Sequence, residues 1–282
     1  MPIIIRIKEG VKAIKAIERV ARIALRPYFW LRYRKESFQA WLRGKGILSN
    51  RNVTFLRNLK QTHEGERCFI VATGPSLTME DLNLIKDEFS FGMNSCVLAL
   101  DKTEWIPNIY GIQDEFVYNK IESKLLEEAE TKLKDKIFVS NTISSLFNSS
   151  EFFHEFFLHY LDHKYDHSKT GEIKFSEDCE IVIFDDYSIL FSLMQLAVYM
   201  GFKKLYLLGC DCNYNQEKAH FLEHGVKDPF AANAANRLIF VHSKFKEFAD
   251  AHGVKVVNCT RGGMLEVYPR KTLEEVLSSD NS

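Results

Sequence analysis

The chain lacks the cysteine spacing of a disulfide framework or a zinc ribbon. Its six cysteines include no Cys-x-x-Cys pair, and Cys210 and Cys212 stand too close together for an ordinary disulfide bond. Reduced thiols are typical of the cytoplasm. We therefore expect a cytoplasmic protein that builds its core without disulfides or structural zinc.

The chain also lacks a hydrophobic run that could cross a bilayer. Its longest uncharged run, residues 187–202, has sixteen residues and includes two serines and a glutamine, whereas a spanning helix needs roughly 20 apolar residues. Near the N-terminus, Arg6 and Lys8 interrupt the apolar Ile3–Ile5 before the core of a secretory signal could form. We expect residues 187–202 to form a buried core helix.

The overall composition is that of an ordinary folded domain. The 282 residues are 46% hydrophobic and 27% charged, which suits one large α/β domain or two small ones and excludes collagen-like, low-complexity and wholly disordered chains. The net charge of −1 hides an asymmetry, because residues 1–50 carry twelve Lys and Arg against three Asp and Glu, a charge of +9, and residues 51–282 carry −10. We predict a basic helical arm over 1–50 joined to an acidic domain over 51–282.

The arm has the pattern of an amphipathic helix. Apolar residues recur at helical spacing beside a cationic stripe that runs from Lys8 to Arg26, and Pro27 should break or kink the helix. The aromatic residues Tyr28–Trp30 and Trp41 follow among further arginines and lysines. Basic residues beside aromatics are typical of a helix on an anionic membrane surface. A helix packed on the domain and a contact between copies of the chain are the alternatives, and the acidic domain disfavours nucleic acid.

Strands and helices alternate along residues 51–282. This order predicts an α/β, Rossmann-like fold with a mainly parallel sheet and helices on both faces. Residues 143–180 are irregular and rich in Phe and His, so we expect an insertion or lid there. The expected strands are 67–72, 89–93, 108–112, 137–140, 204–209 and 255–258, with a short apolar run at 181–184, and the expected helices are 78–86, 115–134, 187–200, 231–252 and 272–277.

Small polar residues follow nearly every predicted strand. In parallel sheets, ligands bind outside the carboxyl ends of the strands. These residues therefore predict a ligand cleft, although each one alone is a common turn residue. They are Thr73, Ser76, Asn94, Gln113, Asp114, Asn141, Thr142, Asp211, Asn213, Thr260 and Arg261.

The turn Gly74-Pro75-Ser76 leads from the first strand into a helix. Glycine lets a phosphate approach the backbone, and a helix N-terminus favours an anion, so this turn is a candidate phosphate site; a plain turn is the alternative. The chain contains neither Gly-x-Gly-x-x-Gly nor the P-loop pattern. An ordinary dehydrogenase or P-loop nucleotide site is therefore without support.

The segment after the 204–209 strand offers candidate catalytic groups. Asp211 could ligate Mg²⁺, accept a proton or bind a sugar hydroxyl, Tyr214 could donate to a phosphate oxygen, and His220 could act as a general base. His220 and His224 are four residues apart, but without a third ligand we do not expect zinc. The histidines of the insertion, expected on a polar face or in a lid, are His154, His159, His163 and His167.

Three stretches carry a resemblance to a known family. They are CFIVATGPSL, LYLLGCDCNYNQEKAHF and HGVKVVNCTRGGMLEVYPR. Over about residues 65–278 the chain resembles the bacterial and archaeal 6-hydroxymethylpterin diphosphokinase MptE-like family, whose members often accompany surface-glycan genes. The first two stretches are also similar to bacterial sialyltransferases, which build lipooligosaccharide ends on a Rossmann-like sheet with a lid and without a required metal.

The sialyltransferase likeness implies roles for individual residues. The catalytic histidine of those enzymes falls near Asn236, so His220 would have to replace it from an earlier loop. The likeness implies a nucleotide loop at Gly74, Pro75 and Ser76 (with Thr73 in place of its Asn), a nucleotide contact at Asn94, donor-sugar contacts near Gln113 and Ser188, and a leaving-phosphate contact near Tyr214.

Two enzymatic functions and one binding function follow from these patterns. The leading hypothesis is a glycosyltransferase that needs no cofactor and moves a sugar, on the sialyltransferase likeness a sialic-acid-like one, from a nucleotide donor to a bacterial surface glycan or glycolipid. Its nucleotide would lie at Gly74–Ser76, Asn94, Asn141 and Thr260–Gly262. The alternative is a pyrophosphate transferase from ATP to a pterin alcohol, with Mg²⁺ near Asp211 and Asp114.

The third hypothesis is a non-catalytic nucleotide-sugar sensor or complex subunit. The basic arm favours the glycosyltransferase, because an enzyme that acts on lipid-linked glycan has use for a membrane face. We therefore expect a peripheral protein on the inner face of the cell membrane.

Overall fold

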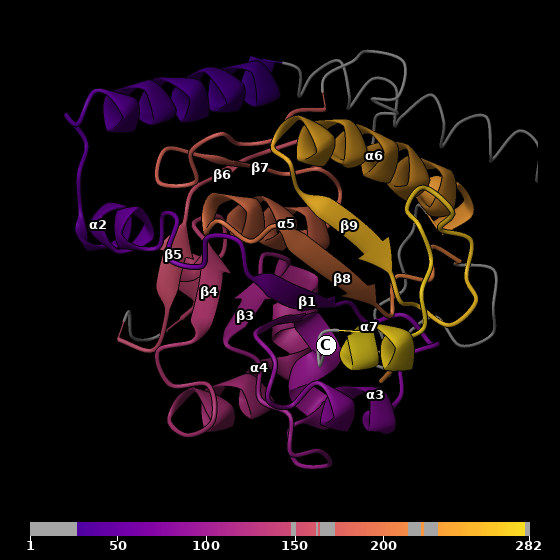
Figure 1. Ribbon diagram of the computed structural model, residues 1–282. Helices are drawn as coiled ribbons and strands as arrows, with labels where there is room; N and C mark the ends of the chain where they lie inside the picture. The colour runs from indigo at the N-terminus through magenta and orange to yellow at the C-terminus, as the bar shows by residue number, and fades with distance from the viewer. Residues whose placement is uncertain are drawn as a thin grey trace, which may run out of the picture.

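The computed structural model describes residues 27–147, 151–161, 163, 173–213, 221–222 and 231–279. Its centre is a seven-stranded sheet in the order β5-β4-β3-β2-β1-β8-β9, in which every neighbouring pair is parallel (Figure 1). The predicted parallel α/β sheet is thereby confirmed. The strands are β1 (Arg67–Val71), β2 (Ser90–Met93), β3 (Ile109–Ile112), β4 (Ile137–Ser140), β5 (His154–Phe156), β8 (Lys204–Leu208) and β9 (Lys255–Asn258).

Helices cover both faces of this sheet. Side chains alternate along a strand, so in β1 Cys68 and Ile70 pack with α5 and α6, while Phe69 and Val71 pack with α3 and α4 on the other face. A strand buried on both faces is continuously apolar, which is why β1 shows no polar alternation. The helices are α2 (Arg51–Asn58), α3 (Met79–Leu84), α4 (Glu115–Ala129), α5 (Ile189–Tyr199), α6 (Ala231–Ala251) and α7 (Leu273–Ser279).

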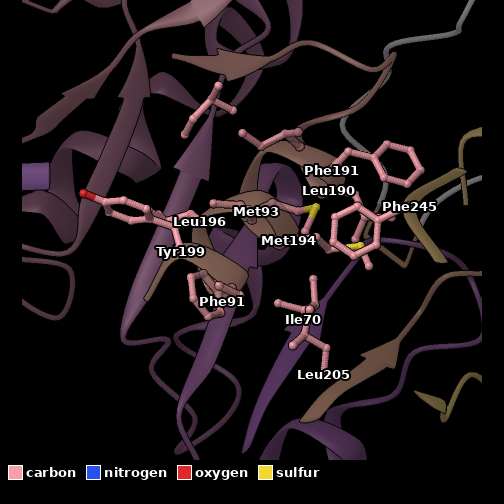
Figure 2. Packing of buried hydrophobic residues seen from close by; sticks show 14 of the residues in the cluster. Ile70, Phe91, Met93, Leu190, Phe191, Met194, Leu196, Tyr199, Leu205 and Phe245 are labelled. Atoms are coloured by element: carbon pink, nitrogen blue, oxygen red, sulfur yellow. The ribbon is translucent and has the colours of Figure 1, made fainter. Parts of the chain in front are cut away.

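The predicted core helix is α5. Ten of its eleven residues are buried, and its N-terminus is capped by the Ser188 hydroxyl, which accepts a hydrogen bond from the Leu190 N–H at 3.3 Å. Figure 2 shows Phe191 of α5 beside Phe245 of α6, and their ring centroids lie 6.4 Å apart. Because α5 is held on the sheet by this core, it gives a rigid wall to whatever lies at its N-terminus.

The sequence prediction missed two strands within the insertion. β5 extends the main sheet beside β4, and β6 (Leu158–His159) pairs in parallel with β7 (Ile183–Phe184) to form a second, two-stranded sheet. These strands are two or three residues long, and their pairing partners lie far along the chain. Part of the insertion is therefore structural.

Residues 27–44 form a helix that packs on this second sheet (Figure 1, indigo). The Glu36 carboxylate accepts from the Tyr160 N–H at 2.9 Å, and the Ser37 hydroxyl lies 3.0 Å from Nε2 of His159. The cationic stripe predicted for residues 8–26 lies outside the described residues. Pro27 is the first described residue of the helix, so the expected break between it and the preceding residues stays a prediction. Among the described residues, no helix is both long and apolar enough to span a bilayer.

Candidate functional site

A cavity of about 140 Å³ opens at the carboxyl ends of β1, β2 and β8. Its volume is close to that of an engineered cavity of roughly 150 Å³ that binds benzene, so it has room for one ring. The walls are residues 72–75, 93–94, 188, 190, 209–213, 238 and 242. The residues predicted from sequence that meet there are Thr73, Gly74, Pro75, Asn94, Ser188, Asp211 and Asn213.

Asn94, at the end of β2, has an unusual backbone. Its φ is 48°, in the left-handed region that residues other than glycine rarely adopt. The Tyr110 hydroxyl donates to the Asn94 carbonyl oxygen and holds this turn. The side-chain Oδ1 of Asn94 is buried and has no hydrogen-bond partner within the described part of the chain. A buried acceptor of this kind is available to a donor on a ligand.

Two further left-handed residues lie at the same cavity. Cys212, with φ of 50°, is part of the wall, and Tyr187, with φ of 71°, directly precedes the wall residue Ser188. A non-glycine residue in this conformation costs about 1–2 kcal/mol, and such strain is concentrated at binding and catalytic sites. The backbone strain therefore marks the same site as the unpartnered acceptor.

No sequence motif points to His242, a fully buried residue of α6 that lines the cavity. Burial lowers the pKa of its imidazole to about 3, so the ring is neutral. Nδ1 lies 3.1 Å from the Tyr268 hydroxyl, whereas Nε2 is buried and finds no hydrogen-bond partner among the residues that the structure describes. The cavity thus carries two buried polar atoms that the described residues leave without a hydrogen bond.

The Gly74 turn is shaped by Asp211. A β-carbon on Gly74 would lie 2.0 Å from Oδ2 of Asp211 and 2.4 Å from the Gly209 carbonyl oxygen. The Ser76 hydroxyl donates to the same Oδ2 at 2.8 Å, and the Gly74 N–H donates to the Gly209 oxygen at 2.8 Å. Close approach of protein groups is therefore sufficient reason for this glycine, and a phosphate site at the turn stays a prediction.

Asp211 connects two turns. Its pKa is raised by burial, against the hydrogen bonds that it accepts from Ser76. Its carbonyl oxygen accepts from the Met264 N–H at 2.7 Å, and a β-carbon on Gly263 would lie 2.7 Å from that oxygen. Asp211 thus holds the turn at 74–76 against the turn at 262–264, which is a positioning role.

A buried carboxylate network lies beside the cavity. Asp185, 4% exposed, accepts from the Gln113 side-chain amide at 3.3 Å, and both of its carboxylate oxygens lie 3.0 Å from Nε2 of His163. Burial opposes protonation of His163, but the charge and hydrogen bond of Asp185 outweigh it, so the pKa of His163 is raised. Arg237, one residue before the wall residue Leu238, donates to the His163 carbonyl oxygen at 2.7 Å.

The sequence profile of one family matches residues 46–217, more than half of the chain. That family is described as 6-hydroxymethylpterin diphosphokinase MptE-like. This chain belongs to the MptE-like family. No curated protein matches it by sequence.

Some solved structures resemble this MptE-like chain at low identity. The MAf glycosyltransferase from Magnetospirillum magneticum AMB-1 is 16% identical, with a TM-score of 0.49 over 82% of this chain and 40% of that protein, so the chain spans less than half of its length. The sialyltransferase CstII from Campylobacter jejuni, in complex with a substrate analogue, cytidine-5'-monophosphate, is 11% identical, with a TM-score of 0.45 over 73% of this chain and 85% of that one. The monofunctional alpha-2,3-sialyltransferase Cst-I from Campylobacter jejuni is 15% identical, with a TM-score of 0.45 over 73% and 80%.

The two carboxylates predicted to share Mg²⁺ in a pyrophosphate transferase do not fit one ion. Asp114 follows β3 and Asp211 follows β8, and β2 and β1 lie between these strands. Three strand spacings of about 4.8 Å separate their backbones by about 14 Å, whereas Mg²⁺ binds oxygen at about 2.1 Å. Within the described ranges, no three His, Cys, Asp or Glu side chains gather as metal ligands. The metal requirement stays a prediction.

Several predicted site residues of this MptE-like chain make contacts within the protein. Asp114 caps α4, accepting from the Val117 N–H at 2.9 Å, and Asn141 Oδ1 accepts from the Leu158 N–H at 2.9 Å. Neither residue belongs to the cavity wall.

The predicted residues after β9 are also engaged within the protein. The Thr260 hydroxyl accepts from the Cys210 N–H at 2.9 Å, and Arg261 forms a two-point ion pair with Asp81 at 2.6 and 2.8 Å. The Gly262 carbonyl oxygen accepts from Arg270. These groups support the turn beside the cavity rather than line it.

The histidines of the insertion divide between packing and the carboxylate network. His154 stacks on Phe55, His159 is buried against Ser37, and His163 pairs with Asp185. The predicted residues that lie outside those described are Tyr214, His167, His220 and His224.

Proposed function

We propose that the chain is a glycosyltransferase that binds part of a nucleotide sugar in the cavity and passes the sugar to a surface glycan or glycolipid. The observation that carries this proposal is a pair of buried atoms, Asn94 Oδ1 and His242 Nε2, that have no hydrogen-bond partner among the described residues and lie in the cavity at the carboxyl ends of a parallel sheet. Sugars and nucleosides carry hydroxyl and amino donors that satisfy such acceptors. Phosphate oxygens do not, because an ionised phosphate mainly accepts hydrogen bonds.

The proposed transfer forms one bond and breaks another. The acceptor hydroxyl oxygen attacks the anomeric carbon, the bond from that carbon to the phosphate oxygen breaks, and the nucleotide leaves with the bonding electrons. The hydroxyl proton passes to a base. His220 and Asp211 stay the predicted bases, and Tyr214 stays the predicted partner of the leaving phosphate. The described part of the chain adds His163, oriented by Asp185, as a third proton acceptor.

The alternative is the pyrophosphate transfer that the family description suggests. Membership of the MptE-like family favours it, and the separation of Asp114 from Asp211 weighs against its predicted Mg²⁺ site. Such an enzyme would need ligands for Mg²⁺ other than this pair.

Calorimetry with a panel of nucleotide sugars tests the cavity. CMP-, UDP-, GDP- and ADP-sugars are titrated with and without EDTA, beside ATP plus 6-hydroxymethylpterin with Mg²⁺. We expect one nucleotide sugar to bind in EDTA, and Asn94→Ala to weaken it about tenfold, because a ligand donor loses its acceptor. Asn83→Ala is the control, because it removes an amide that accepts from the Glu104 N–H and that does not line the cavity. Binding of ATP and pterin alone, dependent on Mg²⁺, would replace the proposal by its alternative.

Helix 27–44 presents an aromatic stripe to solvent. Trp30, Phe38 and Trp41 lie at helical spacing and are 60%, 58% and 53% exposed. The Arg34 guanidinium lies 5.7 Å from the Trp30 ring centroid, and the rings of Phe38 and Trp41 stack with centroids 5.8 Å apart. Glu36 and the buried Arg43 lie on the opposite side of the helix and bond to Tyr160 and Ile181 of the protein, so this stripe points outward.

We further propose that this stripe docks on an anionic membrane surface. Tryptophan and arginine suit the boundary between headgroups and acyl chains, because each joins an apolar body to a polar end. Residues 1–50 carry a charge of +9 and residues 51–282 carry −10, so an anionic surface attracts the arm and repels the domain. Each basic residue near such a surface contributes about 1 kcal/mol. The enzyme would then sit beside a lipid-linked acceptor on the inner face of the cell membrane.

Vesicle flotation of the full-length protein tests this surface. We expect binding to phosphatidylcholine vesicles that contain phosphatidylglycerol at low salt, and release at high salt. A triple variant, Trp30→Ser with Phe38→Ser and Trp41→Ser, should not bind. Phe116→Ser is the control, because it removes an aromatic side chain that is 73% exposed on α4. Equal flotation of both variants would contradict the proposal. If the wild type and Phe116→Ser are dimers that do not bind vesicles, and the triple variant is a monomer, the stripe is an interface between copies of the chain.

A further inference from the structure

Tyr268 fixes which nitrogen of His242 carries the proton. The Tyr268 hydroxyl lies 3.0 Å from the His242 carbonyl oxygen and 3.1 Å from Nδ1 of the same residue. The hydroxyl has one hydrogen, and the carbonyl oxygen can only accept. Both contacts can be hydrogen bonds in one arrangement: the Tyr268 hydroxyl donates to the carbonyl oxygen, and the Nδ1–H of His242 donates to the hydroxyl oxygen. The opposite tautomer would leave two oxygens facing each other and a buried Nε2–H without an acceptor.

The tautomer makes Nε2 an acceptor. The ring is neutral, since burial lowers its pKa to about 3, and a neutral imidazole with its proton on Nδ1 has a lone pair on Nε2. This atom is buried with no partner in the described ranges, and the residue lines the cavity. The Phe191 ring packs edge-on against the imidazole at 4.7 Å between centroids, and the Tyr268 ring packs edge-on at 5.4 Å. The imidazole is therefore held by three contacts, none of which uses Nε2.

We infer that His242 is a specificity-determining residue that accepts a hydrogen bond from an uncharged N–H or O–H donor of the nucleotide sugar. This inference rests on the proposed function and says which chemistry the ligand must bring. A nucleobase with an amino group at this position can donate a hydrogen bond to Nε2. A nucleobase with a carbonyl group there would place its oxygen against the lone pair of Nε2. A sugar or ribose hydroxyl is the second source of the same donor chemistry.

A pair of substitutions separates recognition from packing. The amide of His242→Asn can reach the place of Nδ1 and donate to Tyr268, but leaves no acceptor at the place of Nε2. The longer side chain of His242→Gln can put an acceptor near the place of Nε2. If His242 has only a structural role, the nucleotide affinity of each variant should fall in line with its loss of stability. If His242 recognises the ligand, His242→Gln should restore the discrimination between nucleotides that His242→Asn removes.

Calorimetry on the full-length protein uses four nucleotides and their deoxyribose forms. CMP is compared with UMP, and AMP with IMP, because each pair exchanges an amino group for a carbonyl. We expect the wild type to prefer the amino member about tenfold, His242→Asn to lose the preference, and His242→Gln to recover part of it. A loss of affinity for a deoxyribose form in the wild type but not in His242→Asn would support the inference with a hydroxyl as the donor.

Two outcomes would overturn the inference, and they are distinguishable. If the wild type binds nucleotides and a folded His242→Asn protein binds every member with unchanged affinity, His242 does not read the ligand, although the proposed function stands. If the wild type binds none of the nucleotides or nucleotide sugars, the proposed function fails and the inference fails with it.

Discussion

Acid should destabilise the fold through His242. Its pKa is lowered by burial from 6.5 to about 3, so between these values the unfolded chain binds one proton more than the folded chain. Stability therefore rises with pH in this window and is lost as pH falls below 6.5. The slope for one group is about 1.4 kcal/mol per pH unit. Lowering the pH from 7 to 4.5 should therefore cost about 2–3 kcal/mol, a large share of the roughly 5–15 kcal/mol of a typical domain.

Urea unfolding at pH 7 and pH 4.5 measures this cost in the wild type and in His242→Gln. Asp186 and Asp211 have raised pKa values, so their contributions to stability have the opposite sign, being lost as pH rises. Both proteins contain these groups, so the difference between the two pH dependences isolates His242. We expect the variant to lose about 2–3 kcal/mol less than the wild type on acidification. Identical losses in both proteins would show that His242 is not held neutral by burial, and would refute the tautomer argument.

Three further predictions concern the turn and the carboxylate network. Gly74→Ala should lower the free energy of unfolding in urea by about 3 kcal/mol or more, because its β-carbon would lie 2.0 Å from Asp211. The control Gly44→Ala, whose β-carbon would meet only Ile181 at 3.4 Å, should be neutral or stabilising. Equal effects of the two variants would contradict the close approach at Gly74. Asp185→Asn should cost about 1–3 kcal/mol at pH 6, because it removes the charge that pairs with His163; unchanged stability would show that the pair contributes nothing. Asp186→Asn should gain stability relative to the wild type as pH rises from 5 to 8, because burial and then the charge of Asp185 raise the pKa of Asp186. Parallel pH dependences of the two proteins would contradict a raised pKa.

Local sequence is sufficient to predict the strands that run through the core. β1, β4, β8 and β9 are short apolar runs bounded by turn residues, and their observed bounds lie within one residue of the predicted ranges. The helix expected over 78–86 begins at Thr78, which caps α3, because its side chain accepts from the Asp81 N–H in a capping box. These features depend on neighbouring residues alone, which is why pattern and propensity find them.

Features that depend on distant pairing could not be predicted. β5 is a three-residue strand whose evidence is its pairing with β4, and no local alternation marks it. His163 and Asp185 are 22 residues apart in the chain and meet only because β6 pairs with β7. His242 looks in sequence like any other histidine of a helix, and its burial follows from how α6 packs on α5. The sequence predicts the place of the cleft, but not which atoms it leaves unpartnered.

Catalytic turnover tests the central claim most directly. The full-length protein is incubated with each nucleotide sugar in EDTA, and separately with ATP, 6-hydroxymethylpterin and Mg²⁺, while the released nucleotides are followed by chromatography. The glycosyltransferase proposal predicts release of the nucleotide from one sugar donor in EDTA, in an amount that increases when a glycan acceptor is added. Formation of AMP and a pterin diphosphate with Mg²⁺, with every nucleotide sugar left intact, would contradict it.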